Sequence, residues 1–329
     1  MFNLVLSFFC LLLTAVAQTT YPAPLPCQGT CTNVHDGSII KKGSKGPYYR
    51  FSGTGGITIH IAPDLTGPWT KVGTALDDST DRWAPDVSLV GDTYYLYFSI
   101  SSWGTQNSRI ALATSTTMHP GDWQDLGSTG VESRDGDAYN AIDGNLLQDR
   151  SGNYLTFGSF WGGLYQVPMS SPPTTASDTP YNVELNDTGS RPSEGPYLFN
   201  YGSWYYLFWS SGQCCKYDTE RPAQGEEYKI MVCRSDSPTG PFEDFNQIPC
   251  TQNGGTQVLA SHDNVYGPGG QGIYHDPTYG PIIYYHYVDI TVGFTDGQKL
   301  LGINKLDFSS GWPVLHLSFD VSFILQSVD

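Results

Sequence analysis

Short runs of hydrophobic and aromatic residues recur along this chain, and glycine, asparagine and other polar residues separate them. Tyrosine, phenylalanine, tryptophan and threonine favour strands, whereas glycine and proline mark the turns between strands. We predict a strand at each of five aromatic runs, at residues 47–52, 93–99, 153–159, 204–210 and 281–287. A second β-like segment follows each run, at residues 57–62, 109–114, 163–168, 228–233 and 300–305.

Two further elements extend this repeat. A turn and a short aromatic segment close four of the five copies, ending at Trp69, Trp123, Phe242 and Trp312. The third copy lacks this last element and has a Ser/Pro/Thr-rich loop instead. An acidic residue opens a short strand before each of the first four units, at Asp36, Asp86, Asp143 and Glu194. These acids are 50, 57 and 51 residues apart, and the fifth unit opens instead at residues 266–271.

Five units of four strands each predict an all-β fold, the five-bladed β-propeller. The first strand of each blade would line a central channel, so equivalent positions of successive blades would converge there. The four acids would then form a ring of carboxylates. The alternative is a β-sandwich in which the acids only flank turns, where aspartate is common. We expect a single propeller domain over residues 18–329.

Composition limits the class of protein and its partners. The 329 residues are 14% aromatic and only 15% charged, which excludes a disordered chain. The net charge is −16 and the pI is near 4.6. Nucleic acids and anionic membrane surfaces attract clustered basic residues, so neither is an expected partner. A neutral partner suits this surface better, and we expect a monomer.

The N-terminal segment predicts export from the cell. An apolar run at residues 4–13 is followed by Ala15-Val16-Ala17, which is typical of a signal peptide over residues 1–17. The run is too short to span a bilayer, so we expect a secreted, extracellular protein. The sequon Asn186-Asp187-Thr188 predicts glycosylation at Asn186, on the surface.

Six cysteines would remain in the exported chain, and an even number in an oxidising compartment predicts disulfides. Cys27 and Cys31 could close a small N-terminal loop. Cys214 and Cys215 are adjacent, and the sequence does not decide which of them reaches Cys233 or Cys250. A zinc site is the rival interpretation, but the C-x-x-C pair and the nearby histidine pair that zinc sites use are missing.

Converging carboxyl groups suggest acid/base chemistry. Like charges raise the pKa of some members and hydrogen bonds lower the pKa of others, so one carboxyl can act as acid while another acts as base. Hydrolysis of a glycosidic bond needs that pairing. Aromatic side chains near the acids would offer flat surfaces to sugar rings, and the candidates are Trp83, Trp103, Phe160 and Trp161.

Six stretches make the chain similar to the family 43 glycoside hydrolases, and within that family to secreted fungal endo-1,5-α-L-arabinanases. They are VHD (34–36), DRWAPDV (81–87), YNAID (139–143), LTFGSFWG (155–162), EGPY (194–197) and VYGPGGQG (265–272). Each is weak alone, but together they cover essentially all of the mature chain in order. The resemblance implies cleavage of internal 1,5-α-L-arabinofuranosidic bonds of arabinan, a side chain of pectin, with inversion.

The resemblance also implies roles for individual residues. Asp36 matches the general base, Glu194 the general acid, and Asp143 the residue that orients the acid and adjusts its pKa. In inverting enzymes the acid and base carboxyls lie about 6.5–9.5 Å apart, which leaves room for water. Asp86 has no catalytic counterpart and is expected to organise the channel by hydrogen bonding. The expected substrate-binding residues are His35, Trp83, Asp86, Asn140, Phe160 and Trp161.

The chain departs from the family pattern at two kinds of position. Gly37 and Gly144 stand where the family commonly has proline, and glycine fixes the backbone less firmly than proline does. Several related enzymes hold a metal in the channel through a histidine of the last blade, but residues 269–271 are Gly-Gly-Gln here. His275 and His286 lie nearby without matching that motif. We therefore expect no metal and no other cofactor.

Other functions stay open on the same sequence. An exo-acting α-L-arabinofuranosidase or β-xylosidase would keep the fold, although xylosidases of the family often add a β-sandwich domain and only 17 residues follow Trp312. A non-catalytic carbohydrate-binding propeller is the third alternative, because catalysis is sensitive to small misplacements beside Gly37 and Gly144. A serine hydrolase is not indicated, since no Gly-x-Ser-x-Gly motif occurs and residues 261–263 (Ser-His-Asp) are contiguous.

Overall fold

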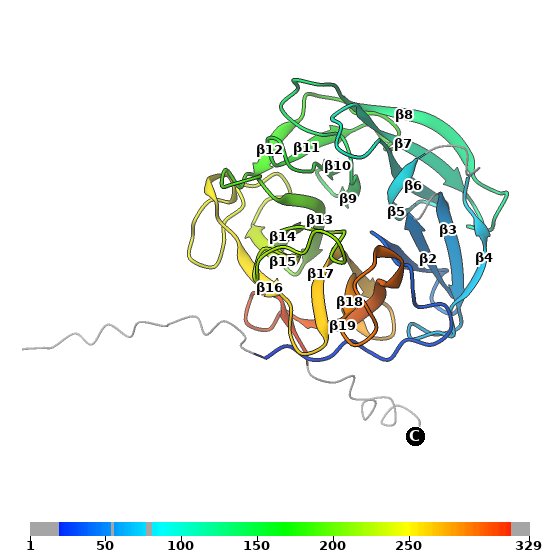
Figure 1. Ribbon diagram of the computed structural model, residues 1–329. Coiled ribbons are helices and arrows are strands. Elements are labelled where there is room, and N and C mark those ends of the chain that lie inside the picture. Colours follow the sequence, from blue (N-terminus) through cyan, green and yellow to red (C-terminus); the bar gives the residue numbers. More distant parts are fainter. Residues whose placement is uncertain (1–19, 54–55, 77–80, 317–329) are drawn as a thin grey trace, which may run out of the picture.

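A computed structural model of the chain describes residues 20–53, 56–76 and 81–316. Their strands form five four-stranded antiparallel sheets arranged radially around a central channel (Figure 1), so the predicted five-bladed β-propeller is confirmed. The signal peptide expected at residues 1–17 lies outside the described residues. Within the described part of the chain, no helix is long and apolar enough to cross a membrane.

Each blade is a meander of four consecutive strands. Blade 1 consists of β1 (Ser38–Lys41), β2 (Tyr48–Gly53), β3 (Ile57–Ala62) and β4 (Thr70–Thr74). Blade 2 consists of β5 (Arg82–Val90), β6 (Thr93–Ile100), β7 (Ser108–Ser115) and β8 (Gln124–Ser133). Blade 3 consists of β9 (Asn145–Asp149), β10 (Gly152–Phe157), β11 (Leu164–Met169) and β12 (Tyr181–Glu184).

The last two blades follow the same order. Blade 4 consists of β13 (Ser193–Tyr201), β14 (Trp204–Ser211), β15 (Lys229–Ser235) and β16 (Thr256–Leu259). Blade 5 consists of β17 (Val265–Asp276), β18 (Gly280–Asp289), β19 (Leu300–Asp307) and β20 (Val314–Leu315). Two 3-10 helices, η1 (Cys250–Gln252) and η2 (Asp296–Gln298), lie in the loops.

The ten strands predicted from the aromatic runs and their successors are the second and third strands of the five blades. These strands are apolar on both faces because each sheet is covered by its two neighbours. Phe51 and Ile59 of blade 1, for example, share one buried cluster with Leu96 and Phe98 of blade 2. A strand buried on both faces gives a continuous apolar run instead of an alternating pattern, which is what the sequence has.

The outermost strands are less regular than the repeat suggested. The expectation that the third copy lacks a fourth element is wrong, because β12 follows its Ser/Pro/Thr-rich loop and completes blade 3. In blade 4 the aromatic segment ending at Phe242 lies in a loop, and the outer strand β16 comes later. Both strands have only four residues, so their sequence pattern is too short to stand out.

The segment before blade 1 joins the two ends of the ring. The Leu25 N–H donates a hydrogen bond of 2.9 Å to the Ile303 carbonyl, and the Val34 N–H donates one of 3.2 Å to the Lys299 carbonyl. The N-terminal segment therefore runs beside β19 of the last blade before the chain enters β1. This contact holds the first and last blades together on one side of the channel.

All six cysteines of the described residues form disulfides, but the partners expected for Cys214 and Cys215 are wrong. Cys214 and Cys215 are joined to each other, so neither reaches Cys233 or Cys250. The reason is their location, since Cys214 and Cys215 lie in the loop after β14, whereas the other two are fully buried in one cluster of the blade core. The pairs are Cys27–Cys31, Cys214–Cys215 and Cys233–Cys250.

Candidate active site

The innermost strands share one backbone feature that sets the direction of the acidic side chains. In each blade, one residue in this strand or directly before it has left-handed φ. These residues are Asp36 (φ 40°), Ala84 (φ 43°), Asp143 (φ 60°), Gly195 (φ 60°) and, in blade 5, Gly270 (φ 57°). This alignment makes Asp36 equivalent to Asp143, but Glu194 lies one position earlier and Asp86 two positions later. The four acids therefore do not occupy one position of the repeat, contrary to the simple ring that their spacing suggested.

Asp36, Asp143 and Glu194 nevertheless meet at one end of the channel. They line a common cavity of about 370 Å³, here called the channel cavity. A second cavity of about 770 Å³, here called the groove cavity, adjoins it between blades 2, 3 and 4. Glu194 lines both cavities, so its carboxyl group lies where they join. Both cavities also share Trp83, Trp103, Ile142, Cys214, Cys215 and Lys216.

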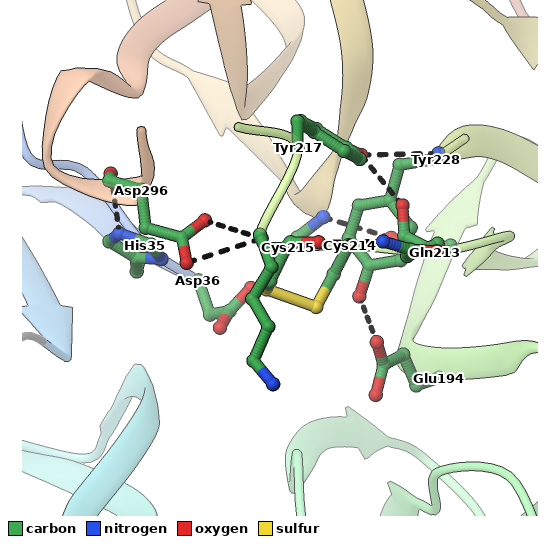
Figure 2. Close-up of a disulfide and its surroundings, with 12 residues drawn as sticks. His35, Asp36, Glu194, Gln213, Cys214, Cys215, Tyr217, Tyr228 and Asp296 are labelled. Atoms are coloured by element: carbon green, nitrogen blue, oxygen red, sulfur yellow. Dashed lines mark hydrogen bonds between the residues drawn. A yellow bond between two sulfur atoms is a disulfide. The ribbon is translucent and has the colours of Figure 1, made fainter. Parts of the chain in front are cut away.

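Glu194 projects from the start of β13 and is held at both carboxylate oxygens. The Ser159 hydroxyl donates a hydrogen bond of 2.7 Å to Oε2, and the Tyr228 hydroxyl donates one to Oε1 (Figure 2). Burial raises the pKa of Glu194, and the negative charge of Asp36 adds to that increase, whereas the two hydrogen bonds oppose it. The net direction is upward, which favours a carboxyl group that keeps its proton.

Asp143 lies just before β9 and is fixed to the blades on both sides. Its N–H donates a hydrogen bond of 2.8 Å to the Ser99 hydroxyl of blade 2. Its Oδ2 accepts a hydrogen bond of 3.1 Å from the Gly195 N–H of blade 4. Burial and the neighbouring charge of Glu194 raise the pKa of Asp143 well above its ordinary value. Asp143 and Glu194 thus form a pair of interacting carboxyls that tends to retain a proton.

Asp36 differs from these two acids because its side chain is 42% exposed. Its N–H donates a hydrogen bond of 3.3 Å to Nδ1 of His286. His286 is buried, and burial together with the charge of Lys299 lowers its pKa well below the ordinary value, so the imidazole is neutral. Gly270 lies against the carboxylate, because a Cβ at this position would be 2.2 Å from Oδ1 of Asp36.

The channel does not fit a metal held by a histidine at residues 269–271. A Cβ on Gly269 would lie 2.1 Å from the Tyr228 ring, and one on Gly270 would collide with Asp36 and His286. The two glycines therefore make room for side chains from other strands. Within residues 20–53, 56–76 and 81–316, no three His, Cys, Asp or Glu side chains are grouped so as to hold a metal ion.

The remaining predicted binding residues divide between the two cavities. His35 and Asp86 line the channel cavity, and Trp83 lines both. The groove cavity is lined by Asn140, Phe160 and Trp161. The sequon at Asn186 lies in the loop after β12, where Asp187 and Thr188 are exposed, and residues 189–192, which follow it, line the groove cavity.

Asp86 belongs to a set of hydrogen bonds that link the innermost strands. Its carboxylate is buried, accepts a hydrogen bond from the Asn145 amide and contacts the next blade. In blades 1 to 3, the side chain two positions after the left-handed residue accepts a hydrogen bond from a backbone N–H of the following blade. These bonds run from Val87 to Ser38 (3.1 Å), from Leu146 to Asp86 (3.2 Å) and from Leu198 to Asn145 (2.8 Å).

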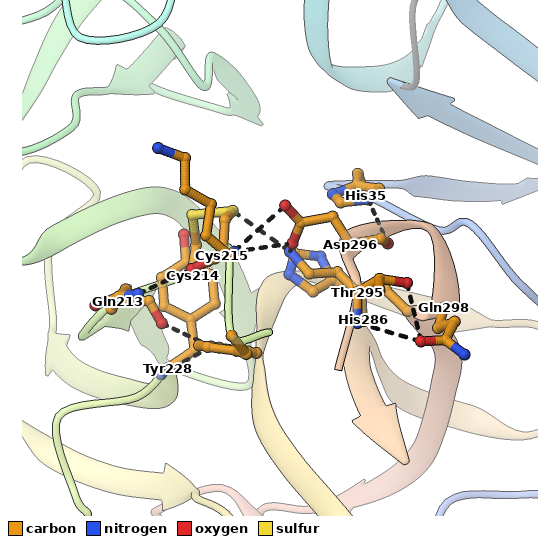
Figure 3. A network of polar contacts seen from close by, with 12 residues as sticks. His35, Gln213, Cys214, Cys215, Tyr228, His286, Thr295, Asp296 and Gln298 are labelled. Atoms are coloured by element: carbon orange, nitrogen blue, oxygen red, sulfur yellow. Dashed lines mark hydrogen bonds and ion pairs between the residues drawn. A yellow bond between two sulfur atoms is a disulfide. The ribbon is translucent and has the colours of Figure 1, made fainter. Parts of the chain in front are cut away.

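Several residues of the site carried no signal in the sequence. Lys299 is fully buried, and its Nζ lies 3.3 Å from Oδ1 of Asp296 and 3.4 Å from Sγ of Cys215. The Asp296 carbonyl lies 3.0 Å from Nε2 of His35, so this network connects the residue before Asp36 to the disulfide (Figure 3). Tyr228 and His286 were also missed. Only the adjacent cysteines, which are rare, could have drawn attention to this region.

Comparisons with known proteins agree with the geometry. Carboxyl groups that meet in one cavity can supply the acid and the base with which a glycoside hydrolase cleaves its substrate. The sequence model of Glycosyl hydrolases family 43 matches residues 31–313. The chain therefore belongs to family 43 of the glycosyl hydrolases.

Individual relatives are close over nearly the whole chain. Arabinan endo-1,5-alpha-L-arabinosidase A of Aspergillus aculeatus is 57% identical over 303 residues, which cover 90% of this chain and 94% of that protein. The Cellvibrio cellulosa alpha-L-arabinanase complexed with arabinohexaose superimposes with a TM-score of 0.77 at 27% identity, over 87% of this chain and 96% of that one. An exo-1,5-alpha-L-arabinanase from a bovine ruminal metagenomic library gives 0.76 at 29% identity, over 88% and 99%.

Proposed function

We propose that this chain is an endo-1,5-α-L-arabinanase that hydrolyses internal bonds of arabinan with inversion at the anomeric carbon. The fungal relative with 57% identity is named for that activity, and a solved relative binds arabinohexaose. The single observation that carries the proposal is that Asp36, Asp143 and Glu194, from three different blades, line one cavity. Glu194 also lines the adjoining groove cavity, which gives the acid access to a sugar on each side.

Glu194 is assigned as the general acid and Asp36 as the general base. Burial raises the pKa of Glu194, so its carboxyl can hold the proton that the departing glycosidic oxygen needs. Asp36 is the more exposed carboxylate and can take a proton from a water molecule that attacks the anomeric carbon. Because the water attacks from the face opposite the leaving group, the configuration of the product is inverted.

Asp143 is assigned as the residue that orients the acid and adjusts its pKa. Its Oδ2 accepts the N–H of Gly195, the residue directly after Glu194, and this bond fixes the backbone that carries the acid. A carboxylate at Asp143 would also repel negative charge on Glu194, which keeps the acid protonated. Asp143 touches no leaving group in this scheme, so its effect is exerted through Glu194.

Endo action is favoured by the way the cavities adjoin. A polysaccharide crossing Glu194 can occupy the channel cavity on one side and the larger groove cavity on the other. Phe160 and Trp161 line the groove cavity, and Trp103, which is 64% exposed, stands at the junction. The exo-acting relative has the same fold, so the fold alone does not distinguish the two modes.

Export and modification complete the proposal. Removal of residues 1–17 would yield a secreted, monomeric propeller over residues 18–329, glycosylated at Asn186. Three disulfides support an oxidising destination, because such bonds form and persist outside the cytosol. The acidic surface favours solubility there, and arabinan carries no charge that the surface would repel.

Product analysis on linear 1,5-α-L-arabinan tests the function. We expect arabino-oligosaccharides of mixed length whose newly formed reducing ends are β-anomers, observed by NMR before mutarotation. Asp36→Ala and Glu194→Ala serve as inactive controls with the same fold. Retention of configuration would contradict the mechanism, release of arabinose alone would indicate exo action, and binding without cleavage would indicate a carbohydrate-binding propeller.

A further inference from the structure

The disulfide between the adjacent residues Cys214 and Cys215 lies at the centre of the site. We propose that it is a sugar-binding surface, which contacts the arabinofuranosyl residues that flank the bond being cleaved. The inference rests on the proposed arabinanase function and assigns an additional part of the same site. It concerns residues that no acid/base role requires.

The location of the disulfide is the first argument. Cys214 and Cys215 line both the channel cavity and the groove cavity, as Glu194 does. Figure 2 shows the two sulfur atoms between Asp36 on one side and Glu194 on the other. Both cysteines are only partly buried, so a ligand in the cavities can reach them. A sugar chain that presents a bond to Glu194 must therefore pass this disulfide.

The disulfide is held in position by its neighbours. Gln213 Nε2 donates a hydrogen bond of 2.9 Å to the Cys215 carbonyl, and the Tyr217 hydroxyl donates one of 2.6 Å to the Gln213 carbonyl. The Lys216 N–H donates to the Asp296 carboxylate at 3.2 Å, in the loop between β18 and β19 of the neighbouring blade 5. These contacts fix the loop between β14 and β15 of blade 4 (Figure 3), so the disulfide is a rigid part of the cavity.

The surface of the disulfide suits a sugar ring. A bond between adjacent cysteines closes a small ring that removes the rotational freedom of both side chains, and the two sulfurs present an apolar, polarisable face. Sugar rings present C–H groups that pack against such faces, while their hydroxyls bind polar groups nearby. Lys216 lies next to the disulfide, with its Nζ 5.3 Å from the centre of the Trp103 ring, so polar and aromatic partners are at hand.

Stability offers little reason for this disulfide. A cross-link stabilises a protein mainly by restricting the unfolded chain, and the effect grows with the length of the loop that it closes. The sequence separation is 1 for Cys214–Cys215, compared with 17 for the fully buried Cys233–Cys250. A cross-link that restricts almost no chain adds little stability. Because this one forms part of the cavity wall, a role in binding explains it better than a role in stability.

The test measures binding of arabinohexaose by calorimetry in a Glu194→Gln background, where the ligand is not cleaved. Cys214→Ala/Cys215→Ala should weaken binding roughly three- to tenfold. The matched control is Cys27→Ala/Cys31→Ala, which removes a disulfide remote from both cavities and should bind as tightly as the parent. Thermal unfolding of each variant shows whether it is folded. Mild reduction of the folded Cys27→Ala/Cys31→Ala protein, followed by reoxidation, tests the same bond without substitution at either cysteine.

The outcomes separate the inference from the proposed function. Weaker binding in the alanine variant, or weaker binding on reduction that reoxidation restores, supports the sugar-binding surface. Equal affinity with and without the Cys214–Cys215 bond would overturn it while leaving the arabinanase assignment intact. Failure of the parent Glu194→Gln protein to bind arabinohexaose would overturn the proposed function and the inference together.

Discussion

The hydroxyl of Tyr228, which lies just before β15, donates a hydrogen bond to Oε1 of Glu194 in β13 of the same blade. Tyr228 is buried, and burial with the nearby carboxylates raises its pKa well above the ordinary value, so the hydroxyl stays protonated and acts as donor. A donated hydrogen bond stabilises the ionised form of the carboxyl and lowers its pKa. Tyr228 therefore limits how far burial can raise the pKa of the proposed acid.

Tyr228→Phe should accordingly change the pH profile in a defined direction. Without the hydrogen bond the pKa of Glu194 rises further, so the alkaline limb of kcat/KM on arabinan should move upward by about one pH unit. We also expect kcat to fall roughly tenfold because the carboxyl loses one of its two positioning contacts. Tyr205→Phe is the control, since Tyr205 is on the same blade as Tyr228 but donates its hydrogen bond to Asp149 of blade 3. A limb that stays in place or moves downward would contradict this role.

Glu194→Gln should nearly abolish hydrolysis and keep substrate binding. An amide of the same shape cannot supply a proton, and general acid catalysis contributes about 10²–10⁴-fold to the rate. We expect kcat on linear arabinan to fall within that range and the melting temperature to change little. Glu132→Gln, an exposed residue of the outermost strand β8, should leave both values unchanged. Hydrolysis at an unaltered rate by Glu194→Gln would mean that another group is the acid.

Gly270→Ala tests the placement of Asp36. A Cβ here would lie 2.2 Å from Oδ1 of Asp36, and φ is +57°, so the variant suffers both a collision and backbone strain. Gly280→Ala separates these effects, because φ is +76° but no atom lies within 4 Å of the added Cβ. Strain alone costs about 1–2 kcal/mol in each variant.

Steady-state kinetics and urea unfolding on the two glycine variants should therefore give different patterns. We expect both proteins to lose stability, but only Gly270→Ala should lose kcat, by about 100-fold, because the proposed base is displaced. Equal kcat values in the two variants would show that the position of the Asp36 carboxylate does not limit the reaction.

The sequence predicts the fold and the central acids because both depend on local patterns that repeat. The aromatic runs are visible since their strands are buried on both faces, as in the cluster around Phe51 and Phe98. Convergence of Asp36, Asp143 and Glu194 follows from the order of the blades. The finer register was wrong because residue spacing includes loops of different length, which hid the shifts of Glu194 and Asp86 relative to Asp143.

The rest of the site depends on contacts between distant parts of the chain. His286 lies in an apolar strand, and its proximity to Asp36 arises only when the last blade meets the first. Lys299 is buried beside Asp296 and Cys215 for the same reason, although lysine usually predicts an exposed position. The pairing of Cys214 with Cys215 could not be chosen from the sequence because it depends on which sulfurs come within bonding distance.

Asp86 should make the stability of the propeller depend on pH. Burial raises its pKa from the ordinary value to about 6, although hydrogen bonds from Leu146 and Asn145 oppose the increase. Between about pH 4 and pH 6 the folded protein therefore holds more protons at this site than the unfolded chain. The free energy of unfolding contributed by this proton is fully present below about pH 4 and is lost as the pH rises through 6.

Substitutions at Asp86 should separate this charge effect from the hydrogen bonds between blades. Asp86→Asn keeps an acceptor for the Leu146 N–H but does not titrate. The difference in unfolding free energy between this variant and the parent should therefore change between about pH 4 and pH 6 and be constant above about pH 6. Asp86→Ala does not titrate either but leaves buried donors of blade 3 unsatisfied, so it should be about 1–3 kcal/mol less stable than Asp86→Asn at every pH. Urea unfolding monitored by tryptophan fluorescence measures both. A pH-independent difference for Asp86→Asn would show that the buried carboxyl does not change its protonation in this range. If Asp86→Ala caused no loss of stability, the contacts between Ser38, Asp86, Asn145 and the following blades would not be what holds the ring together.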